Sequence, residues 1–232
     1  MKKGELRKEA IIRTAEQLFF EKGYEETSIQ DILDALSISK GGFYHYFESK
    51  IALLEEISRQ KCANNIERIR MELFSGRLSS VQKANLLLSS IFPFERESAE
   101  YNALTFKVSY IDGDVHFRNR TRQFMLDELC PLMDETVYEG VSDQSFFVRY
   151  PGHIGRILLM LGYDACEEAC RMLAEDADNP DIIINMMDML YAYREAVEGM
   201  LGCTHGSIVL FNVEQMLSSI RLTAEQIKLL KE

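Results

Sequence analysis

The stretch TSIQDILDALSISKGGFYHYFESK, residues 27–50, predicts two short helices joined by a tight turn. Apolar side chains recur at helical spacing in its first half, so we expect residues 27–35 to form an amphipathic helix that packs on the preceding segment. Thr27, with Gln30 three residues later, fits a capping box at the start of this helix. Proteins that read DNA use such a fixed helix to support a second helix with exposed hydrogen-bond donors.

The second helix is expected to start after Ser39, a favourable N-cap, and to run through Phe47. It contains two adjacent glycines, Gly41 and Gly42, and each destabilises a helix interior by about 1 kcal/mol relative to alanine. A purely structural helix has little reason to carry this pair, whereas close approach of another backbone would explain it. Phe43 and Phe47 are four residues apart and are expected to face inward.

The outward face of the second helix carries groups that bind phosphates and base edges. Lys40, Tyr44 and His45 are expected to point outward, with Lys50 just beyond the helix. Lysine and protonated histidine neutralise phosphate charge, and hydroxyls and backbone N–H groups fix the register on a duplex. One alternative is an aromatic plug of residues 44–46 under a helix corner, and for Lys50 alone another is a solvated surface lysine. The glycines and lysines together favour a DNA-reading helix.

About the first fifty-five residues resemble the helix-turn-helix of the tetracycline-repressor (TetR) family of bacterial transcriptional regulators. The family pattern is an apolar helix, a Thr-Thr/Ser-hydrophobic step, a short Ser-Lys-Gly turn, and an aromatic run that ends in phenylalanine and is followed by a lysine. Many positions match at fixed spacing, while the rest of the chain carries no family motif. The matching residues are Ile11, Ile12, Ala15, Leu18, Phe19, Gly23, Tyr24, Thr27, Ile29, Ile32, Ser39, Lys40, Gly41, Tyr44, His45, Tyr46, Phe47, Ser49, Lys50 and Leu53.

Carried over position by position, the resemblance implies a set of residues that contact phosphates or bases. Ser37 stands where the family has a glycine suited to positive φ, so we expect the turn geometry to differ slightly. Gly42 stands where the family has a small side chain that reaches the DNA, so we expect a backbone contact and weaker direct readout there. The implied DNA-binding residues are Thr27, Ser39, Lys40, Gly41, Gly42, Tyr44, His45, Tyr46 and Lys50.

Length and composition indicate an all-α protein with a small and a larger domain. The chain has 232 residues, 47% of them hydrophobic, with only 4 prolines and 13 glycines. The apolar runs are too short for a membrane span, and no signal-peptide core follows the first methionine. We expect a cytoplasmic protein with an N-terminal three-helix helix-turn-helix domain over residues 1–50. A larger C-terminal helical domain, for ligand binding and dimerisation, is expected over residues 51–232.

The net charge of −11 opposes DNA binding when the chain is taken as a whole. Residues 1–60 carry nine lysines and arginines against eleven acidic residues, so most of the excess acid lies in the larger domain. The field within a Debye length of about 8 Å governs contact with DNA. The cations expected near the DNA are Lys2, Lys3, Arg7, Lys8, Lys40 and Lys50.

Helical periodicity continues through the larger domain. A long helix from Leu53 to near Gly76 is expected to link the two domains mechanically. Ser79 with Gln82, and Asn179 before Pro180, are predicted helix starts, and Pro93 is expected to end a helix. Further helices are predicted over residues 98–110, 115–138 with a kink or join at Pro131, 154–173, 207–221 and 223–231, with a loop over residues 139–151.

The helix over residues 154–173 and the helix after Pro180 carry apolar side chains on two faces. One face is expected to pack within the subunit and, as the resemblance implies, the other on a second subunit. The alternative is a core wholly within one chain. In a homodimer, two heads related by a two-fold axis would read a palindrome, with half-sites about 34–36 Å apart or a multiple of that distance.

The resemblance also implies that a small molecule enters the larger domain, shifts the linking helix and releases the DNA. Eleven methionines, thirteen phenylalanines and ten tyrosines suit an adaptable apolar cavity and equally an ordinary core. Candidate pocket residues have polar or adaptable tips on otherwise apolar helices, although for the histidines the alternative is a satisfied or solvated side chain. These candidates are Phe106, Tyr110, His116, His153, Met160 and Tyr163.

We interpret the chain as a sequence-specific transcriptional repressor that a small-molecule ligand releases from a palindromic operator in double-stranded DNA, with no cofactor or metal. The alternative is a ligand-independent regulator controlled by a protein partner through the acidic larger domain. An enzyme is not expected, since the sequence has no Gly-rich phosphate loop, nucleophile elbow or HExxH motif. The five cysteines lack CxxC or zinc-finger spacing, and Cys166 and Cys170 share an apolar helical face, which favours buried free thiols.

Overall fold

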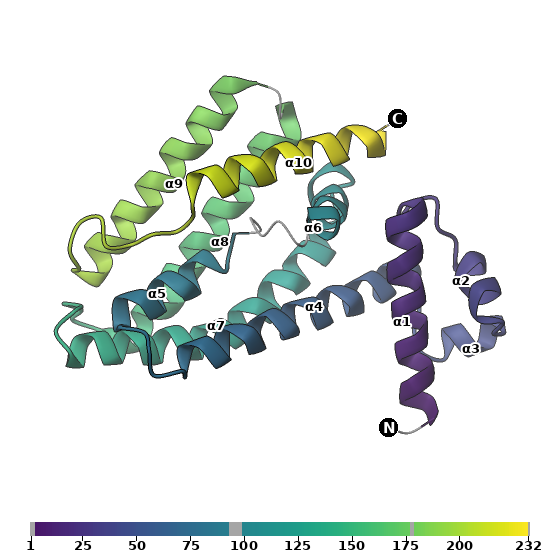
Figure 1. The fold of residues 1–232 in the computed structure, drawn as a ribbon, viewed down its shortest axis with the longest axis horizontal. Helices are drawn as coiled ribbons and strands as arrows, with labels where there is room; N and C mark the ends of the chain where they lie inside the picture. Colours follow the sequence, from purple (N-terminus) through teal and green to yellow (C-terminus); the bar gives the residue numbers. More distant parts are fainter. Residues whose placement is uncertain (1–2, 93–98, 177–178, 232) are drawn as a thin grey trace.

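Helices make up the regular structure of this protein. The computed structural model describes residues 3–92, 99–176 and 179–231, and these ranges contain helices and connecting turns but no strand (Figure 1). The all-α prediction is therefore confirmed. The helices are α1 (Lys3–Lys22), α2 (Ile29–Leu36), α3 (Lys40–Tyr44), α4 (Lys50–Leu73), α5 (Ser80–Ser89), α6 (Ala99–Phe106), the π-helical turn η2 (Lys107–Ile111), α7 (Val115–Ser142), α8 (Pro151–Asp176), α9 (Pro180–Leu201) and α10 (Val213–Lys231).

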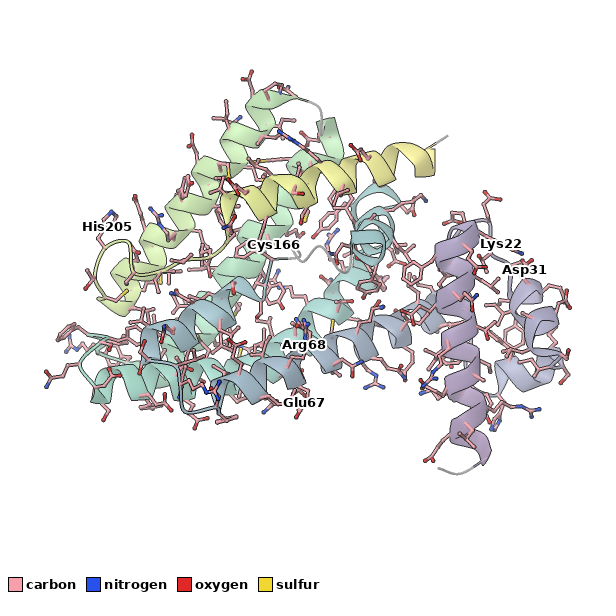
Figure 2. All side chains as sticks on the ribbon, viewed as in Figure 1. Lys22, Asp31, Glu67, Arg68, Cys166 and His205 are labelled. Atoms are coloured by element: carbon pink, nitrogen blue, oxygen red, sulfur yellow. The ribbon has the colours of Figure 1, made fainter. Side chains whose placement is uncertain are left out.

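Helices α1, α2 and α3 pack around the first turns of α4 and form what we call the head, residues 3–57 (Figure 1). Phe43 and Phe47 are buried, as predicted. An ion pair of 2.9 Å between Lys22 and Asp31 joins α1 to α2 at the surface (Figure 2). The apolar faces of all four helices meet in one cluster, which includes Ile11, Ile12, Ala15, Phe19, Ile32, Leu33, Phe43, Phe47, Leu53, Leu54 and Ile57.

The start of α2 differs from the prediction. Ser28 is the N-cap: its Oγ accepts a hydrogen bond from the Asp31 N–H at 3.1 Å, and the Asp31 carboxylate accepts one from the Ser28 N–H at 2.8 Å. Thr27 is buried, and its hydroxyl faces the carbonyl oxygens of Gly23 at 2.7 Å and Leu18 at 3.1 Å. The predicted capping box at Thr27 is therefore wrong, because Thr27 binds the end of α1 and leaves Ser28 to cap α2.

The turn between α2 and α3 depends on Ser37. This residue has φ 51° and ψ 43°, which is the left-handed conformation, and its N–H donates to the carbonyl of Asp34. Serine here adopts the positive φ for which a glycine is suited, and a side chain in this region costs about 1–2 kcal/mol. Because serine replaces the glycine of the family pattern here, the backbone at Ser37 is strained.

Ser37→Gly is expected to raise the free energy of unfolding by about 0.5–1 kcal/mol, because glycine adopts this φ without a Cβ clash but adds entropy to the unfolded chain. Urea denaturation followed by circular dichroism measures the change. Ser142→Gly, at the last residue of α7, is a control without positive φ and should lower the same free energy. A loss of stability in Ser37→Gly would contradict the assignment of strain.

The larger domain is built on α7 and α8. Helix α7 packs against α4, α5 and α8, and α8 packs against α9 (Figure 1). Helix α4 belongs to both parts of the molecule, since its first turns lie in the core of the head while Ile66, Ile69 and Leu73 lie in the core of the larger domain. A single continuous helix therefore joins the head to the larger domain.

A second connection runs through α6, η2 and the start of α7. Leu104, Val108 and Phe117 pack in the same apolar cluster as the core of the head. The η2 turn has wider hydrogen bonding than an α-helix, as in the bond of 2.8 Å from the Asp112 N–H to the Lys107 carbonyl. Such π-helical turns are rare and are frequent at functional sites. The head thus contacts the larger domain through two separate elements.

Helix ends in the middle of the chain match the prediction in part. Ser79 and Gln82 form the predicted capping box at the start of α5. Helix α7 contains Pro131 and continues to Ser142, so the predicted loop starts four residues later than expected. Pro93 and residue 98 lie outside the described residues, and α5 ends at Ser89.

The C-terminal segment forms one helix where two were predicted. Residues 203–212 are irregular, and α10 follows as a single helix. The buried Glu198 carboxylate of α9 accepts a hydrogen bond of 3.1 Å from the Ile208 N–H, and the Asn85 side chain donates to the Ser207 carbonyl at 3.0 Å. These bonds hold the segment against α9 and α5 as a loop, which is why its apolar pattern does not become a helix.

Candidate nucleic-acid interface and internal cavity

Helix α3 presents a polar face to solvent. The Ser39 hydroxyl oxygen accepts a hydrogen bond from the Gly42 N–H at 3.2 Å and caps the helix as predicted. The inward burial of Phe43 and Phe47 fixes which side of the helix faces outward. Of the predicted contact residues, Ser39, Lys40, Gly41, Tyr44 and His45 are exposed, while Gly42 and Tyr46 are half-buried.

Nothing within the described chain requires Gly41 or Gly42 to be glycine. A Cβ on Gly41 would meet no atom within 4 Å, and a Cβ on Gly42 would meet Ser39 Oγ at 3.5 Å, which is normal van der Waals contact. Neither glycine has a positive φ. Each glycine costs the helix about 1 kcal/mol relative to alanine, and the packing of the head does not explain why glycine is present at these two positions. Close approach of a DNA backbone to α3 would explain it.

Two predicted contact residues are engaged within the head. The Thr27 side chain is fully buried, so its hydroxyl is not on the surface. The Lys50 ammonium donates to the Tyr24 carbonyl at 2.7 Å and lies 4.2 Å from the centroid of the Tyr24 ring. A phosphate contact by Lys50 would therefore come from an ammonium that is already fixed by the turn before α2.

Lys40→Ala is expected to make the slope of log affinity against log salt shallower by about 0.9, because one phosphate contact is lost. Lys50→Ala is expected to give a similar change and, in addition, to lower the free energy of unfolding by about 1 kcal/mol through the lost bond to Tyr24. Fluorescence anisotropy at several salt concentrations measures the slope. Lys83→Ala in α5 is the control, and an unchanged slope in Lys40→Ala would reject the phosphate assignment.

A cavity of about 760 Å³ lies in the larger domain. Its walls come from helices α4 to α10, with η2 and the segment before α10, and it reaches Phe117, which also packs in the core of the head. Most of the wall is apolar, as expected for a site that binds a small molecule. The aromatic residues of the wall are Phe92, Tyr101, Phe106, Tyr110, Phe117, Tyr163 and Phe211.

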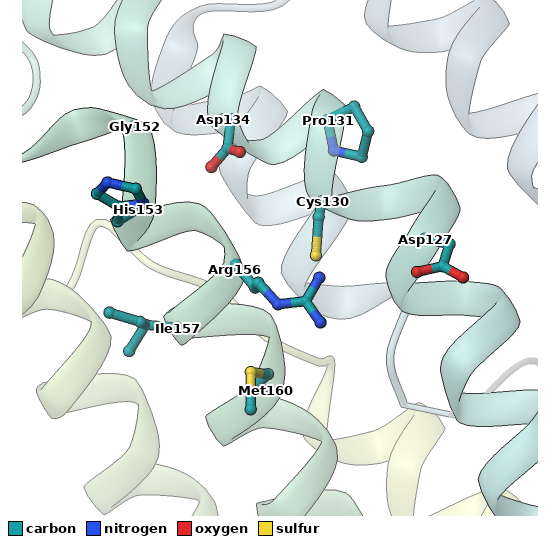
Figure 3. Close-up of a pocket in the computed structure, with 9 residues that line it drawn as sticks. All are labelled: Asp127, Cys130, Pro131, Asp134, Gly152, His153, Arg156, Ile157 and Met160. Carbon is teal, nitrogen blue, oxygen red and sulfur yellow. The ribbon is translucent and has the colours of Figure 1, made fainter.

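The six predicted ligand residues do not come together in one place. Phe106, Tyr110 and Tyr163 line the cavity of about 760 Å³. His153 and Met160 line a separate open pocket of about 580 Å³ between α7 and α8, shown in Figure 3. His116 is exposed and is a wall residue of neither. Residues 153 and 163 were both predicted to line one pocket, but they face different sides of α8.

The open pocket lies at the surface, between α7 and α8. Figure 3 shows His153, Arg156 and Met160 on α8 opposite residues of α7, including Asp134. One Asp134 carboxylate oxygen is buried and has no hydrogen-bond partner among the described residues, and burial raises the pKa of this carboxyl. Ile157 and Met160 remain exposed beside it.

The cysteines of the cavity are free thiols. Cys62, Cys166 and Cys170 line the wall, and none of them forms a disulfide (Figure 2 labels Cys166). Burial raises the pKa of Cys62 to about 11, and the hydrogen bond with Cys170 together with burial raises the pKa of Cys166. The thiols of Cys62 and Cys166 are therefore protonated at neutral pH and poor nucleophiles. Among the described residues, no group of His, Cys, Asp and Glu is arranged to hold a metal ion.

None of the five charged residues of the wall was predicted, and three of them lie together. Arg118 and Arg122, one turn apart on α7, face Glu167 of α8, with distances of 3.3 Å and 3.7 Å between guanidinium nitrogens and carboxylate oxygens. In the sequence these residues look like the solvated face of a helix. Only the packing of α7 against α8 makes them part of a cavity.

None of the described helices is both long enough and apolar enough to cross a membrane.

Comparison with known proteins places the chain in a family. Residues 11–57 match the bacterial regulatory proteins of the tetR family. The chain is 34% identical, over 52% of its length and 63% of the relative, to an uncharacterised HTH-type transcriptional regulator in the lacX 3′ region of Lactococcus lactis. It is 30% identical, over 60% of its length and 68% of the relative, to the HTH-type transcriptional repressor KstR2 of Rhodococcus jostii.

A solved structure has the same fold. FadR from Bacillus subtilis, in complex with stearoyl-CoA, is 18% identical and aligns with a TM-score of 0.51 over 80% of this chain and 96% of that one. The chain spans only about three fifths of the length of the Lactococcus relative. With the family match in the head, the similarity to KstR2 and the shared fold, the chain belongs to the TetR family of bacterial regulatory proteins.

Proposed function

We propose that this protein is a transcriptional repressor that reads a palindromic operator with α3 and leaves the DNA when a small molecule fills the cavity. The observation that carries the DNA-binding part is the exposed face of α3, where a lysine, two hydroxyls and a histidine surround glycines that the head itself does not need. Family membership and the naming of KstR2 as a repressor support the same assignment.

The proposed reading unit is a homodimer formed by α8 and α9. Ile157, Met160 and Leu161 are exposed on α8, and Ile184 and Met200 are exposed at either end of α9. Between those two residues one row of exposed positions, at four-residue spacing, is Asp188, Ala192 and Ala196, and Asn185, Glu195 and Gly199 are exposed beside it. Small side chains on one helical ridge let a second helix pack closely. Two copies joined there would present two α3 helices to successive half-sites.

The proposed signal travels through the two connections between cavity and head. Helix α4 lines the cavity with residues such as Cys62 and Ile69 and packs in the head with Leu53 and Ile57. Phe117 lies both in the cavity wall and in the core of the head. A ligand that moves either element would change the separation of two heads. A coupling of about 1–3 kcal/mol would change DNA affinity by about 5- to 150-fold.

The DNA-binding part is tested by selecting duplexes from a random pool and measuring their affinity by anisotropy. We expect an inverted-repeat sequence and a dimer bound to it. The double variant Lys40→Ala, Tyr44→Ala should lose this preference, while its folding, followed by circular dichroism, should remain. Absence of any duplex preference in dilute salt would refute the proposal.

The ligand part is tested by screening small molecules for release of the selected duplex. Thr121→Trp places a large side chain in the cavity wall and should keep DNA binding but lose release. Gln123→Trp, on the exposed side of the same helix, is the matched control and should respond as the unchanged protein does. If no compound releases the DNA but a protein partner does, control through the acidic larger domain becomes the better account.

A further inference from the structure

The charged side chains that line the cavity are mostly basic, although the protein is acidic. Among the described residues that line it, four are basic, Lys61, Arg68, Arg118 and Arg122, and one is acidic, Glu167. The whole chain carries a net charge of −11. The partners of two of these cations, Glu16 for Lys61 at 2.5 Å and Asp164 for Arg122 at 2.7 Å, are not among the described wall residues. Most of the charged side chains that line the space are therefore basic, and Lys61 and Arg122 each have a carboxylate partner outside the wall.

Two of the arginines share one carboxylate at long distances. Arg118 Nη2 lies 3.3 Å and Arg122 Nη1 lies 3.7 Å from the Glu167 carboxylate, whereas good charge-assisted hydrogen bonds are about 2.7–2.9 Å long. The Arg118 Nε is buried and has no acceptor among the described residues. Arg118 Nη1 donates to the Ser109 carbonyl at 2.9 Å, so the donor that Arg118 keeps for a further acceptor is its Nε–H, one of the five N–H groups of a guanidinium.

The same arginines lie over aromatic rings of the cavity. The Arg118 guanidinium carbon is 5.2 Å from the centroid of Tyr110, and that of Arg122 is 5.9 Å from the centroid of Tyr163. Stacking of this kind orients the planar group and leaves its edge for a bidentate acceptor. The rest of the wall is mostly apolar, with side chains such as Phe106, Met125 and Phe211, and suits an uncharged body.

We propose that the cavity binds an amphipathic organic anion, with its anionic head between Arg118 and Arg122 and its apolar body among the aromatic residues. A ligand cation would instead meet mostly basic side chains, and the one lining carboxylate, that of Glu167, is shared by the two arginines. A neutral apolar ligand would leave the buried Arg118 Nε without an acceptor. This inference deepens the proposed function and rests on it for the role of the cavity.

The test compares two fluorescent probes that share one aromatic body. 1-Anilinonaphthalene-8-sulfonate carries a sulfonate, and N-phenyl-1-naphthylamine does not. We expect the sulfonate to bind the full chain at least about tenfold more tightly, since a hydrogen bond to a charged group contributes that much or more. Displacement of the neutral probe should likewise be stronger with decanoate than with decylammonium. Equal affinities, a preference for the ammonium, or no binding of the sulfonate at about 1 mM would overturn the proposal.

Variants separate charge recognition from loss of folding. Arg118→Gln and Arg122→Gln should each weaken the sulfonate roughly tenfold to a hundredfold and leave the neutral probe nearly unchanged. Glu167→Gln removes the competing carboxylate and should tighten the sulfonate, an effect that damage to the fold cannot produce. Arg171→Gln, exposed on α8, is the matched control. Equal losses for both probes, or weaker sulfonate binding in Glu167→Gln, would contradict the assignment.

These measurements need no DNA, so the two proposals fail separately. If the sulfonate binds through Arg118 and Arg122 but no anion releases the selected duplex, ligand control of DNA binding fails while the anion site stands. If DNA is released only by neutral or cationic compounds that Thr121→Trp excludes, the proposed function stands and the anion site is overturned.

Discussion

Gly41→Ala is expected to make the protein more stable and to weaken its binding to DNA. Alanine should raise the free energy of unfolding by about 1 kcal/mol, since the glycine lies in α3 and a Cβ there meets no atom within 4 Å. The same methyl group would hold a DNA backbone away from α3. Loss of one charge-assisted contact of about 1.5–3 kcal/mol lowers the affinity roughly tenfold to a hundredfold.

The opposite signs of the two effects make this experiment informative. Denaturation gives the stability, and anisotropy with the selected duplex gives the affinity. Thr14→Ala in α1 is a control that also raises helix propensity in the head but lies outside the proposed contact face. It should increase stability and leave DNA binding unchanged. If Gly41→Ala binds DNA as well as the unchanged protein does, the glycine pair has no role in approach to DNA.

Gly42→Ala should behave similarly with a smaller gain in stability. Its Cβ would contact Ser39 Oγ at 3.5 Å, beside the hydrogen bond that caps α3. The two variants therefore distinguish a contact made at the exposed Gly41 from one made at the half-buried Gly42.

The sequence was sufficient for the elements whose local chemistry decides their structure. The burial of Phe43 and Phe47, the Ser39 cap and the Ser79–Gln82 capping box all depend on residues within four positions of each other. Periodicity and capping act over such distances, so they are readable without the fold. The cap of α2 was readable too, from Ser28 and Asp31, but Thr27 offered a competing cap one residue earlier.

Contacts between segments far apart in the chain could not be predicted from the sequence. Thr27 was assigned to DNA through the family resemblance, and only the fold shows that its hydroxyl is bound by the carbonyls of Leu18 and Gly23. The same limit applies to the cavity. Arg118 and Arg122 belong to the cavity because they pair with Glu167 of α8, about fifty residues away in the sequence. The loop after α9 has a helical apolar pattern, but the hydrogen bond from Ile208 to Glu198 holds it as a loop.

Ala196→Arg is expected to convert the dimer to a monomer and to lower DNA affinity by at least about a hundredfold. The residue lies on the exposed side of α9, four positions before the exposed Met200. In a close helix–helix contact an arginine there would meet its own copy across the two-fold axis, with both steric clash and like-charge repulsion. Two linked heads bind about 10²–10⁴-fold more tightly than one, and this gain is lost with the dimer.

Sedimentation velocity measures the assembly, and anisotropy with whole and half operators measures the affinity. The variant should bind a half operator and a whole operator equally, since each head then acts alone. Ser75→Arg, exposed after α4, adds the same charge away from α9 and should remain a dimer. A dimer that persists in Ala196→Arg would place the subunit contact elsewhere. A monomer that still prefers the whole operator would mean that one head recognises more than a half-site, and the palindrome would then no longer follow from α9.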